Sequence, residues 1–499
     1  MKNFKCILSL ILCLLFIPFY SINTTALSSE YFVEKPLETA EALGLTAPDF
    51  DSMVSEIFSA VANSEDYCDL TKYKIEYGSE TYMTFYDLIF GNPEFFHIDQ
   101  IICYYSSSYL VTALEFEYLY AKEEYQTKLG EVRNRAKEFV NGITDDMPDA
   151  QKALLIHDRL AANCEYDYDN LMAGTIPFEA YTLYGALATE RAVCQGYARA
   201  MVYLLDMAGI HSYTCPSDQL NHMWVIAYID GKKYHIDTTW DDPVLNLNGR
   251  ALHRNFLVST ATLKQTAPLP HLADDYDETP VSEKYDHFFW ENIESAFCLF
   301  EGKLYYVDNA KKTIFEYDFD TGNSEKVLRI DAKWMASDTT WWDSNFTKLA
   351  TDGENLYYSL PEGIYSLDPI SGESKAVFTP DMSEHKSFSI YGFKCSDGKL
   401  VCQAYSTPNI TPFTETKTYV YELSSHPEQG EPEIPALPSR GDVSADGIIA
   451  VDDALSVLRV AASMSAITED ILKYGDMDAD GKITVADALA ILRIAAKLA

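Results

Sequence analysis

The sequence predicts a multidomain protein that combines an α+β core domain, a β-rich region and a small α-helical module. Its 499 residues exceed what one hydrophobic core usually supports. The apolar pattern changes near residue 275 from helical spacing to short β-type runs. A twelve-residue acidic pattern near the end of the chain occurs twice, which indicates a separate, duplicated module.

The composition fits folded protein and limits the partners. Hydrophobic residues make up 47% of the chain and charged residues 23%, as in globular domains. The 76 acidic residues outnumber the 38 basic ones, and the net charge is −38. Contacts with nucleic acid need clustered Lys and Arg, so we expect no nucleic-acid partner. The cysteines show no repeated spacing of a disulfide scaffold or zinc site, so we expect mainly buried thiols and leave one or two disulfides open.

Residues 1–26 predict an export signal. The basic residues Lys2 and Lys5 precede an apolar run over residues 6–20, and small polar residues follow. The run is short for a permanent membrane span, although an uncleaved anchor is the alternative reading. We therefore expect a secreted protein, extracellular or in a cell-surface assembly, with no membrane association beyond this signal.

Residues 27–145 are expected to form a helical N-terminal region. Apolar residues lie three and four positions apart over residues 50–62 and again over residues 125–143. No motif there predicts a chemical activity. The region is open to two interpretations, a packed support or a cover over a cleft.

Residues 146–275 carry the clearest chemistry, beginning with a cysteine. Cys194 precedes apolar residues at helical spacing, so we expect it at a helix N-terminus. Backbone N–H groups and the helix dipole favour negative charge there, which stabilises the nucleophilic thiolate. Position alone fits an inert buried cysteine equally, unless a base lies nearby.

A histidine and an aspartate downstream can provide that base. Two alternating runs flank Asp230-Gly231, a strong β-hairpin signal. With this turn, residue 224 faces residue 237, and His222 and Asp237 become diagonal neighbours, roughly 7–8 Å apart at the backbone. Asp237 can then orient the imidazole of His222, which would take the thiol proton. We expect the pair on the outward face of the hairpin.

These residues belong to three blocks that resemble the bacterial transglutaminase-like family. The blocks are Val193-Cys194-Gln195-Gly196-Tyr197-Ala198, His222-Met223-Trp224 and Tyr234-His235-Ile236-Asp237-Thr238-Thr239-Trp240-Asp241-Asp242-Pro243. The resemblance implies a papain-like α+β fold, with Cys194 as nucleophile, His222 as general base and acid, and Asp237 as orienting residue. It also implies acyl transfer from protein or peptide amides. Transfer to an amine gives a transglutaminase, transfer to water gives a cysteine protease, and a non-catalytic binding module is the further alternative.

Residues 276–425 are expected to form a β-rich, propeller-like region. Apolar and aromatic runs follow Gly302, Gly353 and Gly398, and each resembles one β-meander. Three units are too few for a closed propeller of four or more blades. Residues 426–440 then read as a proline-spaced acidic linker.

Residues 441–499 contain two twelve-residue loops that predict calcium sites. Hard Ca²⁺ ions prefer oxygen ligands, which such loops supply at fixed positions from side chains and one carbonyl. The predicted ligands of the first loop are Asp442, Ser444, Asp446, the Ile448 carbonyl and Asp453. Those of the second loop are Asp476, Asp478, Asp480, the Lys482 carbonyl, Thr484 and Asp487. We therefore expect two Ca²⁺ ions.

The duplicated loop and helix resemble a type I dockerin with EF-hand-like loops. A helix is predicted after each loop, since residues 454–459 are echoed by residues 488–493. Position twelve is Asp, where an ordinary EF-hand has Glu. The resemblance implies a cohesin domain of a scaffold protein as partner, as in cellulosomes, the complexes that degrade polysaccharides. A glycan-active role rests on this context alone, because no paired carboxylates suggest it.

Overall fold

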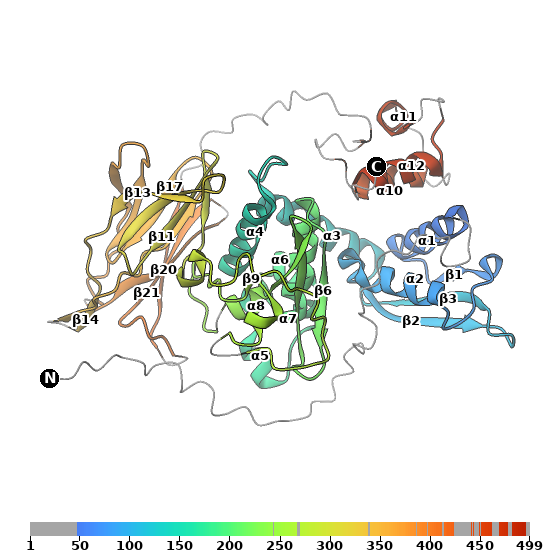
Figure 1. Ribbon diagram of the computed structural model, residues 1–499, viewed down its shortest axis with the longest axis horizontal. Helices are drawn as coiled ribbons and strands as arrows, with labels where there is room; N and C mark the ends of the chain where they lie inside the picture. Colours follow the sequence, from blue (N-terminus) through green and yellow to red (C-terminus); the bar gives the residue numbers. More distant parts are fainter. Residues whose placement is uncertain are drawn as a thin grey trace. The chain divides into compact units, whose positions relative to one another are not determined.

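The computed structural model describes most of the chain after residue 46 (Figure 1). The described residues are 47–242, 244–266, 270–337, 340–385, 387–396, 398–411, 414–423, 441, 443, 449, 451–461, 469–477 and 482–495. They form two compact units, one with residues 148–202 and 212–423 and the other with the remaining described residues. Among the described helices, none is long and apolar enough to cross a membrane. The predicted signal, residues 1–26, and the predicted linker, residues 426–440, lie outside the described residues.

The N-terminal part contains a sheet as well as helices. The helices are α1 (Ala47–Ala62), α2 (Glu80–Gly91) and α3 (Lys122–Val140), with short 3₁₀ helices η1 (Thr71–Tyr73) and η2 (Pro93–Phe95). The antiparallel strands, in sheet order, are β1 (Tyr67–Asp69), β3 (Val111–Tyr118) and β2 (Ile98–Tyr105).

The prediction of a helical region is therefore wrong over strands β2 and β3. Helices α1 and α3 do confirm the helical spacing over residues 50–62 and 125–143. The strands pair through backbone hydrogen bonds, and β3 buries Leu114 and Phe116 under the helices, on either side of the half-buried Glu115. Long-range pairing of this kind overrides local spacing.

The next part is an α+β domain built around a four-stranded antiparallel sheet. Its elements before the sheet are α4 (Asp149–Asn163), β4 (Glu165–Tyr166), α5 (Tyr168–Ala173), η3 (Phe178–Tyr181), α6 (Leu183–Leu187), β5 (Arg191–Ala192) and α7 (Cys194–Met207). The sheet, in order, is β6 (Ser212–Ser217), β7 (His222–Ile229), β8 (Lys232–Ile236) and β9 (Phe256–Val258), and the short helices α8 (Thr238–Asp241) and α9 (Thr260–Leu263) flank β9 in sequence.

The hairpin of β7 and β8 has the predicted register. Val225 pairs with Ile236, and Ile229 pairs with Lys232. Asp230 and Gly231 form the turn, with φ of 51° and 73°, and this left-handed pair is what a tight hairpin turn requires. The pairing places the end of β8, and therefore Asp237, beside the start of β7.

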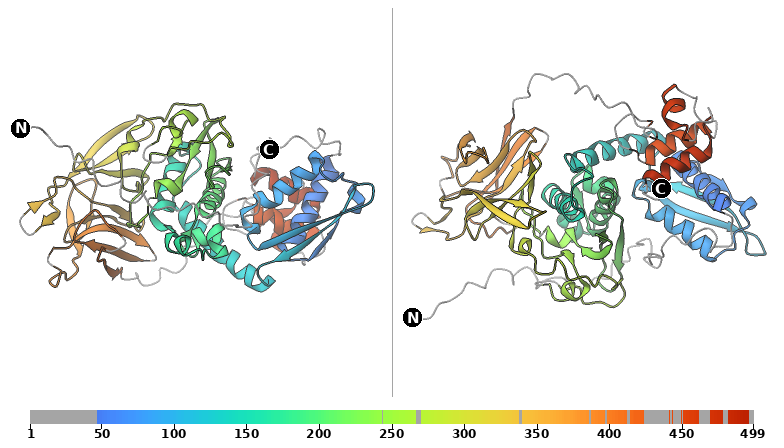
Figure 2. Two further views of the ribbon diagram at one scale, coloured as in Figure 1. Left: turned by 90° about the horizontal axis from the view of Figure 1, so that it is seen from below. Right: turned by 45° about the horizontal axis from the view of Figure 1, so that its top comes forward.

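The β-rich part consists of antiparallel meanders (Figures 1 and 2). Its first sheet is β10 (Cys298–Phe300), β11 (Lys303–Asp308), β12 (Thr313–Asp318) and β13 (Asn323–Arg329), preceded by η4 (Phe289–Asn292). The second is β16 (Leu349–Thr351), β17 (Leu356–Leu360), β18 (Gly363–Leu367) and β19 (Ser374–Phe378). The third is β20 (Ser389–Ser396), β21 (Lys399–Tyr405) and β22 (Lys417–Glu422), and β14 (Met335–Ser337) pairs with β15 (Thr340–Trp341).

The predicted repeats correspond to these meanders. Gly302, Gly353 and Gly398 have positive φ values of 74°, 90° and 68°, and each lies in the turn before β11, β17 or β21. Neighbouring sheets share apolar cores, such as the one that joins Val307 to Leu356. The β-rich prediction is confirmed, whereas the propeller-like arrangement stays a prediction.

The meanders pack closely against the α+β domain. The backbone N–H of Phe297 donates to the buried Asp158 carboxylate at 2.6 Å. Gly249 has a φ of 75°, and a Cβ there would lie 2.3 Å from the carbonyl oxygen of Phe393, so both the conformation and the space demand glycine. The two parts therefore share one packed boundary.

The C-terminal part contains the helices α10 (Val451–Ala461), α11 (Glu469–Gly475) and α12 (Val485–Ala495). Val457 of α10 and Ile491 of α12 are fully buried in a common apolar core. Helices α10 and α12 follow the two acidic loops, as the sequence predicts.

Candidate functional site

Cys194 is the first residue of helix α7, in agreement with the prediction from sequence. Its thiol is free and half-buried. Gly196, two residues on, is tightly enclosed, because a Cβ there would lie 2.5 Å from the carbonyl oxygen of Ala180 and 2.8 Å from the Cβ of Ala192. This close packing fixes the first turn of α7, and with it the place of the cysteine.

His222 and Asp237 meet as the hairpin register predicts. Nε2 of His222 lies 2.7 Å from Oδ2 of Asp237. Asp237 also caps α8, because its Oδ1 accepts a hydrogen bond from the backbone N–H of Trp240 at 3.2 Å. The expectation of an outward-facing pair is wrong: His222 is 9% exposed and Asp237 is fully buried, since loops cover this face of the sheet as well.

Cys194 completes the group. Its thiol lies close enough to His222 to raise the pKa of the imidazole. Burial lowers the pKa of His222, but the charge and hydrogen bond of Asp237, together with Cys194, outweigh burial and raise that pKa to about 10. Burial alone would raise the pKa of Asp237, yet its two histidine partners hold it well below the usual range. The arrangement therefore favours an imidazolium beside a carboxylate, which is the setting that stabilises a thiolate.

Two tryptophans surround His222. The Trp240 ring stacks on the imidazole, with centroids 4.8 Å apart and an interplanar angle of 17°. Trp224 lies 5.7 Å from it and is buried, so it belongs to the core more than to a cleft wall. The near-parallel contacts of both tryptophan rings with the imidazole restrict it to one orientation.

A second histidine, His271, also reaches Asp237. Its Nε2 lies 2.9 Å from the same Oδ2 atom that binds His222, and the side chain is fully buried. No sequence signal pointed to this residue, because it lies 34 positions after Asp237 in a loop without periodicity or motif. His235 is structural, since it accepts a hydrogen bond from Trp224 Nε1 at 3.0 Å in the core.

A further buried group lies in the same domain. Oδ1 of Asp158 accepts hydrogen bonds from Nδ1 of His157 at 2.8 Å and from Nε2 of His253 at 2.9 Å. His157 lies on helix α4, and its side chain is fully buried. Within the described part of the chain, this group and the one formed by His222, Asp237 and His271 are those with ligand-type atoms close enough for a metal ion. Hydrogen bonds between the side chains account for the short distances within both groups.

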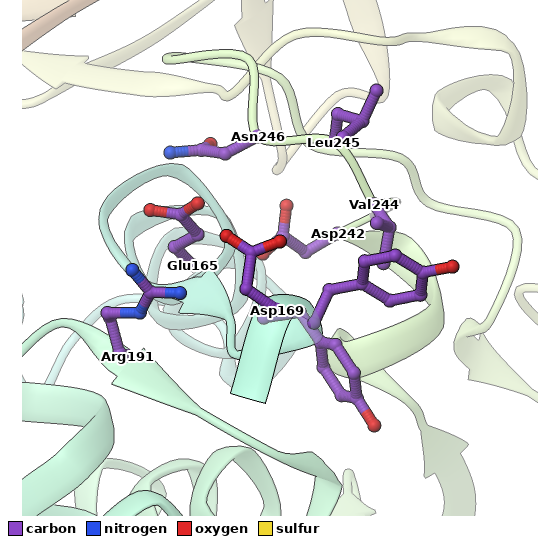
Figure 3. A pocket seen from close by; sticks show the side chains of 9 residues that line it. Glu165, Asp169, Arg191, Asp242, Val244, Leu245 and Asn246 are labelled. Carbon is purple, nitrogen blue, oxygen red and sulfur yellow. The ribbon is translucent and has the colours of Figure 1, made fainter. Parts of the chain in front are cut away.

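The α+β domain also contains a polar pocket (Figure 3). Its lining residues are Glu165, Tyr166, Tyr168, Asp169, Arg191, Asp242, Val244, Leu245 and Asn246. Burial raises the pKa of Tyr166, and the charge of Cys194 raises it further, so this side chain lies within electrostatic range of the thiol. Burial likewise raises the pKa of Asp242 to about 7, and its Oδ2 accepts a hydrogen bond from the Tyr197 hydroxyl at 2.6 Å.

The second acidic loop is partly described. Asp487 is buried, its Oδ1 accepts from the backbone N–H of Met477 at 2.8 Å, and its Oδ2 accepts from N and Oγ1 of Thr484, both at 2.8 Å. Asp453 and Asp476 are buried too. Buried carboxylates in so small a module fit a hard cation. The remaining predicted ligands of the two loops that lie outside the described residues are Asp442, Ser444, Asp446, Ile448, Asp478 and Asp480.

Comparison with known proteins gives a family match over part of the chain. Residues 133–238 match the transglutaminase-like superfamily, so the chain contains a transglutaminase-like domain. One similar solved structure is a TGase, at 12% identity and a TM-score of 0.21, covering 28% of this chain and 44% of the other. Another is a candidate protease from Parabacteroides distasonis, at 15% identity and a TM-score of 0.17, covering 28% of this chain and 35% of the other. The chain thus spans less than half of either structure, and no curated protein matches it.

Proposed function

We propose that this protein is a secreted thiol acyl-transfer enzyme that acts on protein or peptide amides. The observation that carries the proposal is the group formed by Cys194 at a helix start, His222 and the buried Asp237. A thiol alone at this place would fit an inert residue. A histidine that is held by a carboxylate and lies close to the thiol is the arrangement of nucleophilic catalysis.

The reaction follows from the hydrogen bonds. The Cys194 thiolate attacks the amide carbonyl, and the tetrahedral intermediate collapses as His222 gives its proton to the leaving amine. Nε2 of His222 is engaged by Asp237, which leaves Nδ1 as the nitrogen available to exchange a proton with the thiol. The thioester is then attacked by an amine or by water, with His222 taking the proton of the incoming nucleophile.

The pocket of Figure 3 favours an amine as acceptor. Glu165 and Asp169 line the pocket with carboxylates, while the Arg191 guanidinium in the same lining is paired with Asp167 at 2.9 Å. Tyr166, also in the lining, lies within electrostatic range of the Cys194 thiol. Negative charge in a confined pocket attracts a cationic primary amine, such as a lysine side chain. Hydrolysis, which would make the protein a cysteine protease, is the second candidate, and the same thioester serves both.

We further propose that the C-terminal module is a type I dockerin that binds two Ca²⁺ ions and anchors the enzyme to a cohesin. The buried Asp453, Asp476 and Asp487 support this, together with Thr484, which lies against Asp487. Calcium supplies no step of the acyl transfer. Its role there would be to hold the loops that position α10 and α12.

A labelled primary amine and a glutamine-containing protein test the proposal. We expect wild-type protein to incorporate the label and Cys194→Ala to incorporate none. Cys103→Ala removes another partly buried thiol, in β2, and serves as the matched control, with incorporation unchanged. Cleavage that depends on Cys194, without label, would identify a protease, and the absence of both would contradict the enzyme. Repeating the assay with calcium or chelator tests whether the C-terminal module affects activity.

A further inference from the structure

Asp237 receives one more hydrogen bond than a catalytic carboxylate needs in order to hold its histidine. Oδ1 accepts from Trp240 N, while Oδ2 accepts from His222 at 2.7 Å and also from His271 at 2.9 Å. Two imidazoles therefore share a single oxygen atom.

We propose that His271 is a positioning residue that limits how strongly Asp237 stabilises the His222 imidazolium. This inference rests on the proposed function of Cys194 and His222. A carboxylate oxygen that already accepts a hydrogen bond from His271 carries less free negative charge for a second partner. The proton is consequently easier for His222 to give to the leaving amine.

The hydrogen bonds fix the proton on His271. An ionised carboxylate only accepts, so Nε2 of His271 must donate to Asp237. Nδ1 of His271 is buried and has no hydrogen-bond partner. A neutral imidazole leaves only a lone pair at that atom, whereas a protonated ring would bury an unsatisfied N–H. His271 is therefore a neutral donor.

The packing holds the donor in place. The Trp240 ring lies 4.0 Å from the His271 ring, and Trp224 meets it edge-on at 4.8 Å. The hydroxyl of Tyr276 donates to the His271 carbonyl oxygen at 3.1 Å. The side chain and the backbone of His271 are thus both fixed. A residue that only filled space would not need this constraint.

The other ionisable neighbours stay neutral near pH 7. Burial lowers the pKa of His235 to about 3. Burial raises the pKa values of Cys215, Tyr166 and Tyr276 above their ordinary ones. The charge next to Asp237 is therefore governed by His222 and Cys194, and a change at His271 should be visible in the ionisation of His222.

His271→Phe keeps a ring and removes the donor, whereas His271→Gln keeps an N–H donor. One hydrogen bond to a charged group is at stake, so we expect the pKa of His222 to rise by about one unit in His271→Phe. His271→Gln should restore most of the wild-type value. His287→Phe replaces an exposed histidine and should change nothing.

The rate of Cys194 alkylation by iodoacetamide, measured against pH on the full chain, reads this shift without a substrate. The upper transition of the profile reports loss of the imidazolium proton, and we expect it about one unit higher in His271→Phe. A profile identical to wild type, in a folded variant, would overturn the inference. If the wild-type protein itself shows no enhanced Cys194 alkylation below the ordinary thiol pKa, the proposed function is overturned instead.

A second measurement uses wild-type protein alone, so it tests the inference even if the variants do not fold. The ¹⁵N shifts of the imidazoles in wild-type protein distinguish the two neutral tautomers of histidine. We expect His271 to be protonated at Nε2 between pH 6 and 8. Protonation at Nδ1, or at both nitrogens, would refute the donor role directly.

Discussion

Replacing Asp237 with Asn should abolish the thiol chemistry while the fold survives. The raised pKa of His222, about 10, depends on the charge and hydrogen bond of Asp237, and burial pulls in the opposite direction. Without the carboxylate, that pKa should fall to 6.5 or below, so that at pH 7.5 no more than about 10% of His222 is protonated. The Asn amide would also turn an N–H toward Nε2 of His222 and favour the wrong tautomer. We expect the rate of amine incorporation to fall by about 10³- to 10⁴-fold.

The assay compares Asp237→Asn with Asp343→Asn, a change at a fully exposed aspartate. Amine incorporation and Cys194 alkylation are measured between pH 5 and 10, and circular dichroism checks the fold. The alkylation rate near pH 6 should fall at least tenfold in Asp237→Asn and stay constant in Asp343→Asn. A folded Asp237→Asn protein that keeps the wild-type alkylation profile would refute the role assigned to this carboxylate.

Four further outcomes are expected. Gly196→Ala should lower the free energy of unfolding by about 1–3 kcal/mol in urea titrations, because the new methyl group meets the Ala180 carbonyl; an unchanged midpoint would contradict the packing described at α7. The pKa of His222 is raised on folding, so its contribution to stability is full below pH 6.5 and is lost as pH rises through about 10; thermal melts across this window should show a decline that His222→Gln lacks. Chelation of Ca²⁺ should lower the melting temperature of the C-terminal module, and Asp487→Asn should remove most of that response. Glu165→Gln should raise the KM for the amine several-fold without changing the rate of hydrolysis.

The geometry of the pair could be predicted because it is local. The turn at Asp230 and Gly231 sets the register of β7 and β8, and the register alone brings His222 to Asp237. The position of Cys194 is equally local, since it follows from the apolar spacing of α7. What the pattern did not predict is burial, because the loops that cover the pair come from elsewhere in the chain.

Residues that act through distant contacts escaped the prediction. His271 reaches Asp237 from a loop, and no spacing relates the two. His157 lies in helix α4, and Asp158, His253 and Phe256 contact its ring from positions that the helical spacing does not relate to it. Strands β2 and β3 were missed for a similar reason. Their pairing leaves no signal in the apolar spacing of the neighbouring helical segments.

The buried Asp158 makes the sequence boundary near residue 275 a poor place to divide the chain. Its carboxylate oxygens accept hydrogen bonds from His253 and from the backbone of Phe297, and His253 in turn bonds the carbonyl of Ile293. A catalytic fragment ending at residue 275 would therefore expose this carboxylate without its amide partner. A version of the thiol domain transplanted into another protein would therefore have to extend at least through Phe297 to keep this carboxylate fully hydrogen-bonded.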